Sequence, residues 1–225
     1  MSEHGVPDPN LAPAGPVSAA GPAIEAVELT KMWSPSAGLR PVTCTVEAGE
    51  MVVVRGRSGS GKSTLLALLA GLCAPDGGTV RVAGTVPGAD MPWHRLALVP
   101  QVLGMAVELS ILENIVDAAA GTPGGLDEAR LGGLLERLDV APFARRGLGE
   151  VSMGQQQRAA VARALVQVPA VLLVDEPTSF QDGRHADDVV AELHRSAAEG
   201  AAVLVATHDP IVVAAADRVL DLLAV

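Results

Sequence analysis

The sequence predicts an α/β protein with a largely parallel sheet, an antiparallel part near the N-terminus and an inserted α-helical subdomain. Two continuous apolar runs, 170–175 and 201–207, are flanked by helical patterns, which is typical of parallel strands buried on both faces. A glycine-rich turn joins the apolar segment 50–56 to a helical pattern that begins at Lys62. Residues 105–150 indicate helices interrupted by glycines. These three observations define the fold class.

The remaining segments complete this fold. We expect short strands at 24–30, 42–48 and 50–56, and further strands at 79–84 and 95–100. Residues 217–223 are expected to add a last edge strand. The glycines at 121–125, with Gly132 and Gly133, are expected to break the helical subdomain, which we place at about 102–165. Residues 23–225 form one domain, and the five prolines within 1–22 indicate a disordered tail.

Composition limits the function classes. Hydrophobic residues make up 49% of the chain and aromatic residues only 2%, so the core must be mostly aliphatic. The net charge is −10 without a basic run, which argues against nucleic acid as a partner. No apolar run approaches the roughly 18–20 residues of a membrane span, and the N-terminus does not resemble a secretion signal. We therefore expect a cytoplasmic protein that reaches a membrane only through a partner.

The segment GRSGSGKST at 56–64 fits the phosphate-loop pattern at every fixed position. Its glycines let backbone N–H groups approach phosphates, and the following helix N-terminus adds positive potential. Lys62 can reach the β- and γ-phosphates, and the Ser63 hydroxyl can hold Mg²⁺. The residues predicted to surround the nucleotide phosphates are Gly56, Ser58, Gly59, Ser60, Gly61, Lys62, Ser63 and Thr64.

A pair of acidic residues ends the apolar run 170–175. At this strand end beside the phosphate loop, Asp175 can hold Mg²⁺ through water. Glu176 can then orient and deprotonate the water that attacks the γ-phosphate.

Six motifs in order give the chain a family resemblance over about residues 24–222. They are GRSGSGKST, VPQ ending at Gln101, LSILENI at 109–115, VSMGQQQR at 151–158, VLLVDEPTSFQD at 171–182 and ATHDP at 206–210. Together they resemble the nucleotide-binding subunits of ATP-binding-cassette (ABC) systems. The resemblance implies ATP and Mg²⁺ as cofactors.

The resemblance also implies roles for single residues. Gln101 resembles the glutamine that senses Mg²⁺ and the γ-phosphate, and His208 resembles the switch histidine that contacts the γ-phosphate. Residues 179–182 resemble the segment called the D-loop, with Asp182 at its usual place. Trp33 stands where the family has an aromatic residue that stacks on adenine. Each residue also has an alternative interpretation that needs no family role. Gln101 would then be an ordinary loop residue, His208 a helix-capping residue and Trp33 a packing residue.

The octapeptide VSMGQQQR implies a second chain. Ser152 is a predicted N-cap, and the resemblance implies that Ser152, Gly154 and Gln155 close over the ATP held by a partner in a head-to-tail dimer, here a homodimer. Met153 departs from the family pattern, which has glycine there. If Met153 has helical φ and ψ angles it is tolerated, but a positive φ would cost about 1–2 kcal/mol. The D-loop also departs from the usual Ala-Leu, with Phe180 and Gln181.

The function expected from these residues is ATP hydrolysis that drives a separate integral membrane permease, at the inner face of the cell membrane. The compact cassette looks like the subunits of macrolide-export and lipoprotein-release systems, and the permease is expected in a groove near Gln101. Two alternatives remain: a regulatory cassette that moves a membrane partner without transport, and an ATP-binding module that hydrolyses poorly because of Met153. A phosphate-loop kinase does not explain VSMGQQQR or the His208 segment.

Overall fold

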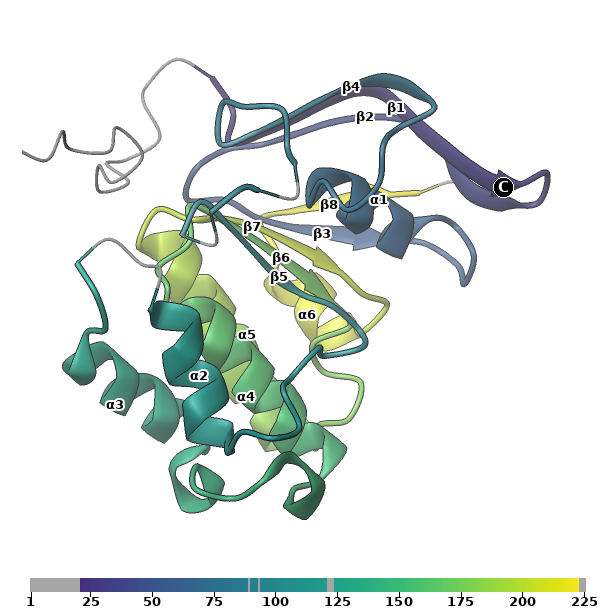
Figure 1. The fold of residues 1–225 in the computed structure, drawn as a ribbon. Coiled ribbons are helices and arrows are strands. Elements are labelled where there is room, and N and C mark those ends of the chain that lie inside the picture. Colours follow the sequence, from purple (N-terminus) through teal and green to yellow (C-terminus); the bar gives the residue numbers. More distant parts are fainter. Residues whose placement is uncertain (1–20, 89, 93, 121–123, 223–225) are drawn as a thin grey trace, which may run out of the picture.

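The computed structural model describes residues 21–88, 90–92, 94–120 and 124–222 (Figure 1). Most of the tail expected at 1–22 lies outside these residues. The strands are β1 (Ile24–Ser34), β2 (Ala37–Val46), β3 (Met51–Arg55), β4 (Gly77–Val82), β5 (Leu96–Val99), β6 (Val171–Asp175), β7 (Ala202–Ala206) and β8 (Arg218–Asp221). The helices are α1 (Lys62–Leu69), α2 (Ile111–Ala119), α3 (Glu128–Arg137), α4 (Met153–Leu165), α5 (Gly183–Ala198) and α6 (Pro210–Ala215), with two short 3₁₀ turns at Ala141–Phe143 and Leu148–Glu150.

The strands form two sheets. The N-terminal strands make an antiparallel sheet in the order β2-β1-β4, and the other five make a parallel sheet in the order β5-β6-β7-β3-β8. The predicted fold class is therefore confirmed, including the antiparallel part and the edge position of the last strand.

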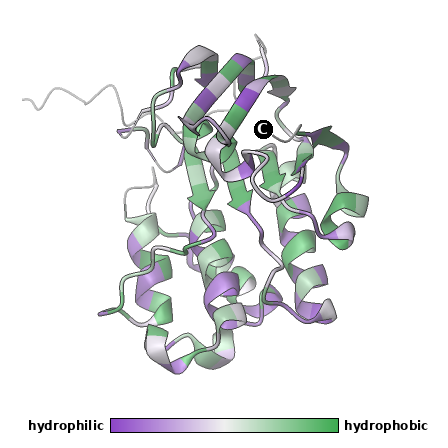
Figure 2. Cartoon of the chain, turned by 90° about the vertical axis from the view of Figure 1, so that its right-hand side faces the viewer, coloured by the Kyte–Doolittle hydropathy of each residue, from purple (hydrophilic) through white to green (hydrophobic). Residues whose placement is uncertain are grey.

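Each central strand of the parallel sheet is buried on both faces. Along β6, Leu172 and Val174 belong to the apolar cluster beneath the helices, whereas Val171 and Leu173 belong to the cluster that faces the antiparallel sheet. Figure 2 shows these strands as mostly hydrophobic, whereas the helices carry mixed surfaces. Because residues 171–174 alternate between two apolar clusters, one on each face of the sheet, this part of the strand is apolar without interruption.

Helices cover both faces of the parallel sheet. Helix α1 contacts β2 and β4 on one side and β6 and β7 on the other, so it lies between the two sheets, while α4 and α5 pack on the opposite face (Figure 1). The loops after β3, β6 and β7 leave from one edge of the sheet, because these strands are parallel neighbours. This is the edge at which open α/β sheets bind ligands.

One expectation about local structure is wrong. Gly132 and Gly133 do not break a helix, because α3 runs through both of them. Each glycine costs a helix about 1 kcal/mol relative to alanine, but the Asp127 N-cap and the burial of Leu131 and Leu134 outweigh that cost. Of the expected break at 121–125, only Gly124 and Gly125 are described, and both have positive φ angles.

The first two strands are also longer than expected. They form a hairpin in which Ser34 pairs with Ala37 across a two-residue turn, and this extension brings Trp33 to the tip of the sheet. Among the helices of the described residues, none has the length and apolar character needed to cross a membrane.

Candidate active site

The phosphate loop connects β3 to α1. Gly59 and Gly61 have φ angles of 81° and 93°, in the left-handed region that favours glycine. A Cβ atom on Gly61 would lie 2.6 Å from the carbonyl oxygen of Gly38, so this position requires glycine for space as well. No side chain caps α1, which leaves the N–H groups of its first turn to a bound anion.

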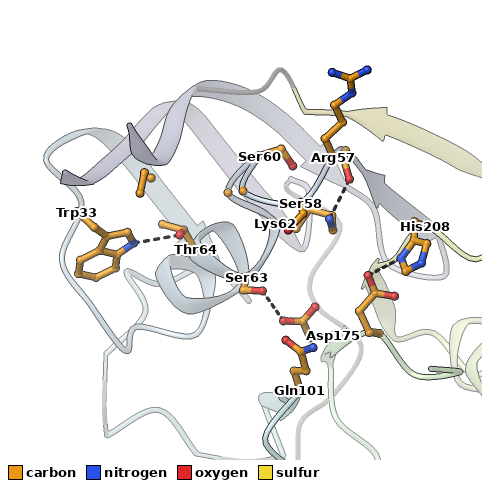
Figure 3. A pocket seen from close by; sticks show the side chains of 16 residues that line it. Trp33, Arg57, Ser58, Ser60, Lys62, Ser63, Thr64, Gln101, Asp175 and His208 are labelled. Atoms are coloured by element: carbon orange, nitrogen blue, oxygen red, sulfur yellow. Dashed lines mark hydrogen bonds and ion pairs between the residues drawn. The ribbon is translucent and has the colours of Figure 1, made fainter. Parts of the chain in front are cut away.

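A pocket of about 580 Å³ opens beside this loop. Trp33 lies at one end and His208 at the other, with the loop and helix α1 between them (Figure 3). The lining residues are Trp33, Ala37, Gly38, Gly56, Arg57, Ser58, Gly59, Ser60, Gly61, Lys62, Ser63, Thr64, Gln101, Asp175, Glu176 and His208. The structure thus brings together all of the predicted phosphate-loop residues with Asp175, Glu176, Gln101, Trp33 and His208.

The donors of the loop fit a phosphate chain. Lys62 Nζ donates to the Gly56 carbonyl oxygen at 2.9 Å, which holds the ammonium group over the loop. Ser60 Oγ is buried and has no hydrogen-bond partner among the described residues. Together with the uncapped N–H groups of α1, these groups give the pocket a positive wall for anionic oxygens.

The opposite wall holds the oxygen donors that a divalent cation would use. Ser63 Oγ donates to Asp175 Oδ2 at 2.7 Å (Figure 3). Burial raises the pKa of Asp175, and the neighbouring Glu176 carboxylate raises it further, whereas the Ser63 hydroxyl lowers it. A bound cation would favour the ionised form of Asp175 by neutralising this charge.

This donor set fits Mg²⁺ together with a nucleotide. The described residues contain no group of three or more His, Cys, Asp and Glu side chains that could hold a metal ion. Mg²⁺ is commonly bound by one or two protein oxygens plus substrate phosphates and water. Ser63 and Asp175 match that pattern, and Gln101, exposed on the loop after β5, can add a third oxygen.

Glu176 is held from two sides. Thr207 Oγ1 donates to Glu176 Oε2 at 2.8 Å, and His208 Nδ1 lies 2.9 Å from Glu176 Oε1. Glu176 itself has a φ of 47°, an uncommon backbone conformation for a residue other than glycine. A carboxylate fixed in this way at the pocket wall can act as a general base toward a water molecule beside the γ-phosphate.

Trp33 is anchored at the far end of the pocket. Its Nε1 donates to Thr64 Oγ1 at 3.1 Å, the residue is 57% exposed, and Lys31 Nζ lies 5.3 Å from the ring centroid. The bond ties the indole to the end of the phosphate loop. An exposed ring in this position suits stacking on a base more than packing in a core.

The octapeptide lies on the first turn of α4, outside the pocket. Ser152 Oγ accepts from the Gln155 backbone N–H at 3.2 Å, and Gln155 Oε1 accepts from the Ser152 N–H at 2.9 Å, which is a capping box. Met153 is the first residue of the helix and does not have a positive φ. The strain considered for Met153 is therefore absent, and its side chain is 48% exposed.

The described residues of the octapeptide and the D-loop do not line this pocket. Ser152, Gly154, Gln155 and Asp182 are all missing from its wall. Asp182 instead caps α5, with Oδ1 accepting from the His185 N–H at 3.1 Å. The chain thus presents a nucleotide pocket and, outside the lining of that pocket, the capped N-terminus of α4.

Sequence reasoning missed some residues of the site. Thr207, fully buried, supports Glu176, and Ala37 and Gly38 form part of the pocket wall. Thr207 directly precedes His208, so the segment ATHDP indicated that it lies near the site. The sequence did not indicate its hydrogen bond to Glu176.

Fold and pocket define a phosphate-loop cassette that binds and hydrolyses a nucleoside triphosphate, and comparison with known proteins gives its family. Residues 39–179 match the family model described as ABC transporter. The lipoprotein-releasing system ATP-binding protein LolD of Paramagnetospirillum magneticum is 40% identical over 194 residues, which cover 82% of this chain and 86% of that protein. The macrolide export ATP-binding/permease protein MacB of Rhodopseudomonas palustris is 38% identical over 193 residues, which cover 82% of this chain but only 30% of MacB.

Solved structures agree. A dimeric post-hydrolysis state of the ATP-binding cassette MJ0796 bound to ADP and Pi has a TM-score of 0.76 at 28% identity, covering 88% of this chain and 94% of that one. A bacterial Atm1-family ABC exporter with ATP bound has a TM-score of 0.77 at 25% identity, covering 96% of this chain and 39% of that one. The chain belongs to the ABC transporter family, and it is an ATP-binding subunit with ATP hydrolase activity.

The support of Glu176 by Thr207 leads to a prediction. Thr207→Val removes one of the two contacts that orient the carboxylate, so kcat for ATP should fall about fivefold, as expected for one lost hydrogen bond of ~1 kcal/mol. The KM for ATP should stay the same, because Thr207 does not line the pocket. Steady-state phosphate release measures both constants.

Thr178→Val is the matched control. Thr178 is a buried threonine whose hydroxyl bonds to Asp209 rather than to Glu176. Equal losses of kcat in the two variants would contradict the role given to Thr207.

Proposed function

We propose that this chain works as a homodimer that drives a separate integral membrane permease, with ATP closing the dimer and hydrolysis opening it. The observation that carries the proposal is the separation of the octapeptide from the pocket of its own chain. The Ser152 hydroxyl and the first turn of α4 form an anion site that needs phosphates from elsewhere. A head-to-tail partner supplies them, and the dimeric form of the similar cassette MJ0796 supports this arrangement.

In this dimer the polar residues of the pocket bind the phosphates, hold the cation and activate water. Lys62 and the loop N–H groups bind the β- and γ-phosphates, while Ser63, Asp175 and Gln101 hold Mg²⁺. The cation, when bound, supplies positive charge against the phosphate oxygens. Glu176 orients the attacking water and accepts its proton, and His208 turns its Nε2 toward the γ-phosphate. The partner's octapeptide closes the side of the pocket that this chain leaves open.

Binding and hydrolysis then act as a switch. ATP held by both chains favours the closed dimer, and loss of the γ-phosphate contacts weakens it, so the interface moves whatever is attached to it. Attachment to a permease would place the chain on the inner face of the cell membrane. LolD, which this chain matches over 86% of its length, is named as the ATP-binding protein of a lipoprotein-releasing system, and this supports a permease on a separate chain.

A second groove offers a place for the permease. It has a volume of about 480 Å³ and lies between the loop after β5 and the helices of the inserted part. Val102 and Val107, on the loop beside it, are 85% and 69% exposed. Its lining residues are Pro92, Gly104, Ala106, Leu109, Asn114, Asp117, Ala118, Arg163 and Gln167. Because this loop also carries Gln101, movement at the γ-phosphate can reach the permease.

Two variants test the catalytic roles. Glu176→Gln keeps the shape of the side chain but removes the base, so turnover should fall at least about 100-fold, the usual range for a lost general base. Stable ATP-dependent dimers should accumulate, visible by size-exclusion chromatography. Lys62→Ala should lose both ATP binding and dimerisation.

The proposal is wrong about hydrolysis if Glu176→Gln turns over ATP like the wild type. Normal ATP binding by Lys62→Ala would overturn the assignment of the phosphate loop. Wild-type dimers that form with ATP and never dissociate would favour the poorly hydrolysing alternative.

A negative charge placed beside the groove tests whether the permease binds there. Val107→Asp should weaken co-purification with the permease and its stimulation of ATP turnover at least about tenfold, because a carboxylate in an apolar contact costs 1–3 kcal/mol or more. Val86→Asp is the control, since Val86 is 70% exposed but lies between β4 and β5 and not on the loop after β5 that borders the groove. If the permease stimulates ATP turnover equally in both variants, the groove is not part of the permease contact.

A further inference from the structure

Gln181 is one of the two residues that depart from the usual D-loop pattern. Its side chain forms hydrogen bonds with three residues, Gly154, Gln157 and Arg158. Its Nε2 donates to the Gly154 carbonyl oxygen at 2.9 Å and to Gln157 Oε1 at 3.3 Å. Its Oε1 accepts from Arg158 Nη1 at 3.1 Å. Arginine has no acceptor, so the contact with Arg158 fixes which end of the Gln181 amide faces Gly154.

A second amide continues this chain of bonds. Gln157 is 3% exposed, and its Nε2 donates to the backbone carbonyl oxygen of Glu176 at 2.5 Å. Because a carbonyl oxygen can only accept, the amino end of Gln157 must face Glu176 and its Oε1 must face Gln181. The bonds therefore run in one direction, from Arg158 through Gln181 and Gln157 to the peptide of Glu176.

The first turn of α4 is also in close contact with the D-loop. A Cβ atom on Gly154 would lie 2.5 Å from the Phe180 carbonyl oxygen, so the D-loop rests directly on the first turn of α4. Arg158, 5% exposed, also donates through Nε to the Leu138 carbonyl oxygen at 2.8 Å. The turn that carries Ser152, the D-loop and the Glu176 peptide are thus held as one unit.

We infer that Gln181 is a positioning residue that couples the octapeptide of this chain to its own Glu176. The inference rests on the proposed dimer, in which the octapeptide acts on the partner's ATP while Glu176 acts on the ATP of its own chain. Through Gln181, the fit of one nucleotide against Gly154 and Ser152 adjusts Glu176, the general base that activates the water attacking the other nucleotide. Gln181 thereby links the two ATP sites of the dimer.

Dimers with one active site test this link. One protomer carries Glu176→Gln and a distinct affinity tag, so hydrolysis is confined to the phosphate loop and Glu176 of the other protomer. Gln181→Leu, which keeps the size but removes the bonds, is placed either on the hydrolysing protomer or on the tagged one. We expect kcat to fall about tenfold in both placements, the effect of one lost positioning bond, with the KM for ATP unchanged because Gln181 does not line the pocket.

Gln167→Leu in the same two placements is the control. Gln167 lies beyond the octapeptide, just after α4, and its amide donates to the carbonyl oxygen of Arg163 and not toward Glu176. Unchanged kcat after Gln181→Leu, a loss in only one placement, or an equal loss with Gln167→Leu would overturn the inference. A parent dimer without turnover, with Gln181 intact in both protomers, would instead count against the proposed function.

Discussion

The rest of the site depends on the hydrogen bond between Ser63 and Asp175, which joins two segments 112 residues apart in the sequence. It holds the start of α1 against the end of β6, and so it sets the distance between the phosphate-binding wall and the acidic wall of the pocket. The Asp175 carboxylate is buried beside Glu176, and both effects raise its pKa. The ionised forms of these two neighbouring carboxylates are stabilised when a cation binds with the nucleotide. Binding of ATP and binding of its metal are therefore linked.

The second constraint is that the chain holds its functional groups in two separate places. The pocket carries the phosphate loop and Glu176, whereas Ser152, at the capped start of α4, does not line that pocket. A chain built in this way completes a site only with a partner. The close contact between Gly154 and the Phe180 carbonyl oxygen also explains why glycine is kept at 154 while Met153, at an exposed helical position, is tolerated.

Much of the fold and the pocket could be predicted because the signals are local. The phosphate loop, the buried strands and the Ser152 cap each depend on residues within one or two turns of each other. The helix continues through Gly132 and Gly133, against the predicted break, because helix propensity is weak compared with the packing of Leu131 and Leu134. The contacts of Thr207 with Glu176 and of Gln181 with Gly154 join residues 31 and 27 positions apart, so no local pattern indicates them.

The central claim is that one active site is shared by two chains, and mixing two inactive variants tests it most directly. Lys62→Ala loses the lysine of its phosphate loop but keeps its octapeptide, while Ser152→Glu, which places a negative charge against the phosphates, keeps its phosphate loop intact. Each variant alone should be inactive, and the mixed dimer should regain turnover at one intact site. A mixture as inactive as its components, under conditions in which mixed dimers form, would contradict the account.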